Sequence, residues 1–93
     1  MNLRGLAVAW FRKEDWARWR SIDPSFEPDY DYWLGRSEEA IQRIGATQRV
    51  EKVIIDPDEF LKWSAANGGK IDAKARAAYA AISLAESDNR KLH

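Results

Sequence analysis

Only two segments of this chain are typical of β-strands, and they lie far apart in the sequence. Residues 6–11 (LAVAWF) form a continuous apolar run with one β-branched and two aromatic residues. Residues 50–55 (VEKVII) contain four β-branched residues and end at Asp56–Pro57. β-Branched and aromatic side chains are favoured in strands. We therefore expect two short strands, with the first covered by other elements on both faces.

The segments between and after these runs are expected to be α-helices. They have apolar positions at helical spacing, together with the residues that begin and end helices. Asp56, Pro57 and Glu59 occupy the first positions of a capping box, and Asp72 is placed to cap the final helix. The expected helices are residues 13–22, residues 28 or 29 to about 44, residues 57 up to a stop at Asn67–Gly69, and residues 73 to about 86.

The resulting order, β-α-α-β-α-α, indicates an α+β or small α/β fold that is mostly helical. The chain has 93 residues, so we expect one globular domain over residues 1–86 and a polar C-terminal tail over residues 87–93. The strands could run parallel or antiparallel. Gly35, inside the second helix, suggests a close contact with a neighbouring element. Because a two-stranded sheet is a poor core, either the helices supply most of the core or a second chain completes the sheet.

Composition excludes several classes of site. The chain has no cysteine, and its single histidine is His93, which excludes disulfides, cysteine-based zinc sites and histidine-rich metal sites. We therefore expect no cofactor and no metal. A net charge of +0 argues against a dedicated nucleic-acid-binding protein. No apolar segment approaches the ~18 residues that span a bilayer. We expect no membrane association and a cytoplasmic location.

Aromatic residues are concentrated in one part of the sequence. Eight of the eleven lie between Trp10 and Trp33, interleaved with carboxylates. Aromatic faces beside carboxylates can bind a cation, but a small domain also needs bulky side chains to fill its core. Helical spacing places most of these aromatic residues on inward stripes. Phe26 and Tyr32 fit the stripes least, and we expect them to be exposed recognition residues.

The candidate ligand or interface residues lie in this aromatic and acidic segment. They are Phe26, Glu27, Asp29, Tyr30, Asp31, Tyr32, Trp33 and Arg36. No catalytic residue is assigned, because the carboxylates lack a partnering histidine or cysteine.

Three functions are compatible with these residues. The first is a non-catalytic protein–protein interaction module that forms a homodimer, since tryptophan and tyrosine are favoured interface anchors and a short sheet has open edges. The second is a domain that binds a small cationic ligand. The third is a nucleic-acid-associated protein that uses Arg12, Lys13, Arg18, Arg20 and Arg36. Residues 53–63 and 75–80 resemble small bacterial proteins, and this resemblance implies no activity and no site.

Overall fold

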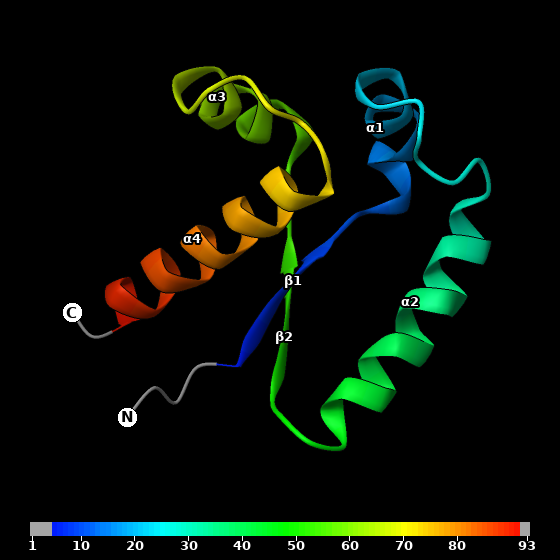
Figure 1. Cartoon of the computed structure of the whole chain (residues 1–93), viewed down its shortest axis with the longest axis vertical. Helices are drawn as coiled ribbons and strands as arrows, with labels where there is room; N and C mark the ends of the chain where they lie inside the picture. Colours follow the sequence, from blue (N-terminus) through cyan, green and yellow to red (C-terminus); the bar gives the residue numbers. More distant parts are fainter. Residues whose placement is uncertain (1–4, 92–93) are drawn as a thin grey trace.

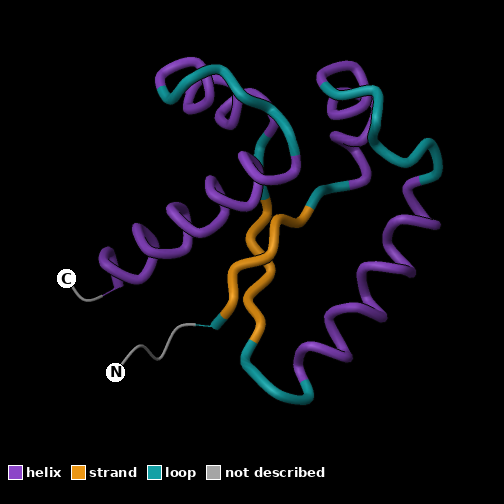
Figure 2. Tube along the Cα trace, in the orientation of Figure 1, coloured by secondary structure: helices purple, strands orange, loops and turns teal. Residues whose placement is uncertain are grey.

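The computed structural model describes residues 5–91 (Figures 1 and 2). The expected β-α-α-β-α-α order and mostly helical fold are confirmed. The elements are β1 (Leu6–Trp10), a 3-10 turn (Lys13–Asp15), α1 (Trp16–Ile22), α2 (Tyr30–Gly45), β2 (Val50–Ile54), α3 (Pro57–Ala66) and α4 (Ala73–Lys91).

The two strands form a parallel sheet, which settles the direction that the sequence left open. Leu6 lies opposite Val50, and Trp10 lies opposite Ile54. The backbone bond from Leu6 N to Arg49 O (2.9 Å) starts the ladder, and the bond from Ile55 N to Trp10 O (3.0 Å) ends it. Parallel strands need a long crossover connection, and α1 and α2 lie within it (Figure 1).

The two faces of the sheet are covered by different helices. Because side chains alternate along a strand, Ala7, Ala9 and Val53 share one face, and they pack against the core beside residues of α4. Trp10 is on the other face, where its ring lies 5.0 Å from that of Trp33 in α2. Figure 1 shows α4 and α2 on opposite sides of the strand pair.

Aromatic side chains from the first part of the chain make most of the core. Trp19 and Phe60 are fully buried, with their ring centroids 5.5 Å apart. The other buried apolar residues are Trp10, Phe11, Trp16, Phe26, Ile55 and Ala80. Most of the aromatic concentration noted in the sequence is therefore used for packing.

Local signals set the helix starts. The Asp56 side chain accepts hydrogen bonds from the amides of Asp58 (3.0 Å) and Glu59 (3.1 Å), as expected for the N-cap of α3. Asp29 caps α2 in the same way. The end of α3 at Asn67–Gly69 is also confirmed, because Gly68 and Gly69 adopt positive φ angles of 104° and 78°.

Three details differ from expectation. Gly35 has nothing within 4 Å of the position that a Cβ would take, so no close contact explains this residue. Helix α4 continues to Lys91 rather than ending near Glu86, since no glycine or proline follows to stop it. Leu6 is 44% exposed, so β1 is not covered along its whole length.

Candidate functional site

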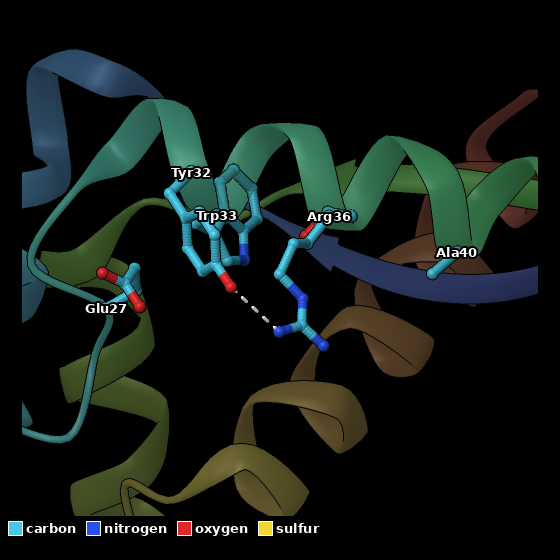
Figure 3. Close-up of a pocket in the computed structure, with 6 residues that line it drawn as sticks. Glu27, Tyr32, Trp33, Arg36 and Ala40 are labelled. Atoms are coloured by element: carbon cyan, nitrogen blue, oxygen red, sulfur yellow. Dashed lines mark hydrogen bonds between the residues drawn. The ribbon is translucent and has the colours of Figure 1, made fainter.

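The eight candidate residues divide into two groups. Four of them line a pocket of about 370 Å³ on the surface of α2, together with two residues outside the candidate set. The other four support the fold. The pocket, here called the α2 pocket, is lined by Glu27, Tyr32, Trp33, Arg36, Ser37 and Ala40 (Figure 3).

Phe26 was expected to be exposed, and this prediction is wrong. The side chain is 8% exposed. Its ring stacks on that of Trp19 at 5.6 Å and meets the edge of Phe11 at 5.2 Å. The Arg76 guanidinium covers it, with Cζ 4.4 Å from the ring centroid. The loop between α1 and α2 folds back onto the core, so Phe26 packs inward although it belongs to no helix.

Tyr30, Asp29 and Asp31 also serve local structure. The Tyr30 hydroxyl donates to the carbonyl of Phe11 (2.9 Å), and burial of this phenol raises the pKa of Tyr30. The carboxylate of Asp29 accepts from the amide of Asp31 (3.0 Å) at the start of α2. The carboxylate of Asp31 lies 3.7 Å from the ammonium of Lys13. None of the three lines the α2 pocket.

Tyr32 is exposed as expected, at 52%. Helical spacing explains which residues accompany it, because residues four apart lie on the same side of a helix. Arg36 and Ala40 follow Tyr32 at this spacing, and Ser37 follows Trp33. This spacing was the signal that could have added Ser37 and Ala40 to the candidates.

Trp33 lines the pocket and is held in place by contacts with the core. Its ring lies 5.0 Å from that of Trp10 and 5.1 Å from that of Trp16. These contacts hold one side of the indole against the core, and the rest of the ring lines the pocket.

The loop that carries Glu27 is held by a buried tryptophan. The indole Nε1 of Trp16 donates to the backbone carbonyl of Glu27 at 2.9 Å. The carboxylate of Glu27 then accepts from the amide of Asp29 at 3.3 Å. Both ends of the residue therefore have a partner, which positions its negative charge beside the pocket.

Arg36 is attached to Tyr32 by a side-chain contact. Its guanidinium donates to the Tyr32 hydroxyl at 3.2 Å, and Cζ lies 5.7 Å from the ring centroid (Figure 3). The hydrogen bond to Tyr32 raises the pKa of Arg36, with smaller contributions from the charges of Glu39 and Glu27. The pocket therefore contains its own permanent cation, so a cationic ligand would meet a like charge there.

Several basic residues considered for nucleic-acid binding form ion pairs with carboxylates. Arg12 Nη2 lies 2.7 Å from Asp15 and 3.1 Å from Asp56. Arg18 pairs with Asp58 at 3.0 Å. These carboxylates reduce the positive potential that a phosphate backbone would meet. These ion pairs and the cap of α3 give the carboxylates of Asp56 and Asp58 a structural role. The backbone hydrogen bonds from Glu59 and Asp58 lower the pKa of Asp56.

A second exposed feature lies at the sheet. Each strand of a two-stranded sheet has one open edge, where backbone amides point to solvent. Since Leu6 N bonds to Arg49 O, alternation directs the amides of Ala7 and Ala9 away from β2. Two large apolar side chains of the sheet, Leu6 (44%) and Ile54 (60%), are exposed.

The described residues limit other site types. The side chains of residues 5–87 include no cluster of three or more histidine, cysteine or acidic groups that could hold a metal ion. Among the helices of this part of the chain, none combines the length and apolar character required to cross a bilayer. Comparison with protein-family models, curated proteins and solved structures finds no match.

Proposed function

We propose that this protein is a non-catalytic interaction module that forms a homodimer through the open edge of β1. The observation that carries the proposal is the composition of that strand. Residues 6–10 (LAVAW) include no charged residue and no proline. Such a sequence is typical of a strand inside a sheet, yet in the single chain β1 is an edge strand.

The other edge has the protection that β1 lacks. Strand β2 carries Glu51 and Lys52, and charged residues, lysine above all, discourage pairing at a sheet edge. The Lys52 ammonium lies 3.2 Å from the carboxylate of Glu38 and 4.3 Å from the ring centroid of Trp10. These contacts tie Lys52 to α2 and to the sheet. They favour β1 over β2 as the edge that a partner would meet.

Strand β1 is suited to antiparallel pairing with its own copy. A twofold axis at Val8 would place Ala7 opposite Ala9 of the partner subunit, and each pair would exchange two backbone hydrogen bonds. The same register sets Leu6 opposite Trp10 of the partner subunit, so two apolar side chains meet on one face. The result is a four-stranded sheet with β1 strands at the centre and charged β2 strands outside.

Two general considerations support a second copy as the partner. A sheet of two strands is only marginally stable, and pairing of two copies would double the number of strands by using ordinary backbone hydrogen bonds. The net charge of +0 means that two copies do not repel each other overall. We keep the cytoplasm as the proposed compartment, because the chain has no cysteine to form disulfides.

Light scattering on purified protein tests this dimer. At tens of micromolar we expect a mass near twice 10.7 kDa. Ala7→Pro removes an amide that the single chain does not use in its own ladder, so the variant should remain folded but become monomeric. Val50→Pro is the matched control, because its amide points to the open edge of β2, and this variant should stay dimeric.

A second variant covers the case in which Ala7→Pro fails to fold by circular dichroism. Val8→Lys would place two ammonium groups opposite each other at the twofold axis, and like charges in that position are destabilising. This variant should also be monomeric. A monomeric wild type across the micromolar range contradicts the proposal, and so does a dimer that survives Val8→Lys.

A further inference from the structure

We propose that the α2 pocket binds a small organic anion, a single carboxylate carried on a planar ring. The pocket brings together aromatic side chains and hydrogen-bond donors that have N–H or O–H groups without a partner in the fold. This inference does not depend on the dimer, because the pocket lies on α2 and in the loop before it rather than on β1.

The donors come from three side chains. The indole of Trp33 lines the pocket, and its Nε1 has no hydrogen-bond partner among the described residues. Figure 3 shows it on the side of α2 toward which the Tyr32 hydroxyl and the Arg36 guanidinium extend. The guanidinium uses one of its five N–H groups on the Tyr32 oxygen, and that hydroxyl still has its own proton to donate. A carboxylate has two oxygens that accept such bonds.

The charges around the pocket select the kind of anion. Arg36 supplies one positive charge that is present at every physiological pH. Glu27 adds a negative charge at the pocket, and it raises the pKa of Arg36 together with Glu39, which contributes more but does not line the pocket. A ligand with one negative charge is attracted to the guanidinium, whereas a second negative charge would be repelled by Glu27. Glu27 therefore disfavours phosphate relative to a carboxylate.

The apolar side chains that line the pocket determine which uncharged part of a ligand fits. Tyr32 and Trp33 present aromatic surface, and Ala40 adds a methyl group at the far end. Aromatic rings pack with ring centroids about 4.5–7 Å apart in tilted or offset arrangements. A volume of about 370 Å³ is at the lower end for small-molecule sites, which suits a ligand with one ring. This class is opposite in charge to the cationic ligand that the sequence suggested, because the pocket already contains the Arg36 guanidinium, with Cζ 5.7 Å from the Tyr32 ring centroid.

Nuclear magnetic resonance of the tryptophan indole groups tests the site with benzoate as the probe. The Trp33 indole resonance is identified by its loss in Trp33→Phe. We expect benzoate to shift it saturably, while the resonance of the fully buried Trp19 indole stays in place. Benzylamine and inorganic phosphate, at equal concentration and ionic strength, should cause no saturable shift.

Two matched variants locate the charge. Arg36→Gln should weaken benzoate binding by about tenfold or more, because a charge-assisted hydrogen bond is lost. Arg43→Gln removes the same charge from the last turn of α2, outside the pocket, and should leave the affinity unchanged. Glu27→Gln should strengthen benzoate binding and allow phosphate to bind. The proposal is overturned if benzoate leaves Trp33 unshifted, if benzylamine binds in its place, or if Arg36→Gln binds benzoate as the wild type does.

Discussion

Two glycines show how differently one residue type can be used in this fold. A Cβ on Gly5 would lie 2.7 Å from the carbonyl oxygen of Arg49, which accepts the first hydrogen bond of the sheet ladder. The backbones of residues 5 and 49 approach each other closely because Gly5 has no side chain. At Gly35, in the middle of α2, a Cβ would meet no atom within 4 Å.

These surroundings predict opposite effects of the same substitution. Gly35→Ala should raise the free energy of unfolding by about 0.5–1 kcal/mol, because alanine is the better helix former and restricts the unfolded chain. Gly5→Ala should lower it by about 1–3 kcal/mol, because the backbone at Arg49 must move. Urea denaturation of both variants measures the difference. Equal effects of the same sign would contradict the contact at Gly5.

Phe26 and Tyr32 show that helical periodicity predicts exposure for a residue in a helix but not for one in a loop. Both lay outside the helical stripes, and both were expected to be exposed. Tyr32 is exposed because it is on a helix whose inward side is already occupied by Trp33. Phe26 is in a loop, where no periodicity constrains the side chain, and the turn closed by its amide on the carbonyl of Asp23 (3.1 Å) directs it inward.

At the scale of elements, an ion pair joins the start of α4 to the loop after α1. Arg76 Nη1 lies 3.0 Å from a carboxylate oxygen of Asp23, with side-chain exposures of 12% and 16%. The same nitrogen donates to the carbonyl of Ile71 at 2.7 Å. This pair connects two elements that the sequence separates widely and covers the ring of Phe26.

Removing the Arg76 guanidinium should lower the free energy of unfolding more than removing an exposed guanidinium does. Arg76→Gln should lower the free energy of unfolding by about 1–3 kcal/mol, because the Asp23 carboxylate loses its partner in a largely covered site. Arg18→Gln is the control, since the pair with Asp58 is exposed, and its effect should stay within about 1 kcal/mol. Thermal or urea unfolding gives both values. Equal losses would contradict the role of burial.

The pair also predicts a dependence on pH. Hydrogen bonds from Ser25, with a smaller contribution from Arg76, lower the pKa of Asp23 below its ordinary value. A lowered pKa in the folded state means that the ionised group stabilises the fold above the unfolded pKa, about 3.9, and loses this effect as the pH falls through the folded pKa. Asp23→Asn should therefore be less stable than the wild type at pH 7, and the difference should shrink below about pH 4.

The helix starts and the positions of the strands were the most predictable parts of this molecule because their signals are local. Asp56 and Asp72 accept amide hydrogen bonds at a helix start, as the sequence indicated. Asp29 does the same at the start of α2, where the sequence had placed residue 28 or 29 inside the helix. The strands were located by their β-branched residues. The direction of the strands depends on how the crossover packs, which no short stretch of sequence encodes. Four of the six residues that line the α2 pocket (Glu27, Tyr32, Trp33 and Arg36) were among the eight candidates, but their separation from Phe26 depends on the fold of the loop.

At the scale of the whole molecule, the unusual feature is β1, an edge strand whose apolar sequence is typical of a strand inside a sheet. β1 is held on one face by α4 and contacts Trp33 of α2 on the other, so both faces are engaged while its outer edge is open. The described residues thus pack around one core, while the outer edge of β1 has no paired strand among them. Antiparallel pairing of two copies would remove both exposed edges of β1 at once.

Amide hydrogen exchange measured residue by residue tests this account most directly. In the proposed dimer, the amides of Ala7 and Ala9 would donate to the partner subunit, whereas the outward amides of Lys52 and Ile54 on β2 would remain open to water. We predict slow exchange at Ala7 and Ala9 at tens of micromolar protein, and exchange at least tenfold faster at Lys52 and Ile54. Exchange at Ala7 and Ala9 as fast as at Lys52 would contradict pairing through β1.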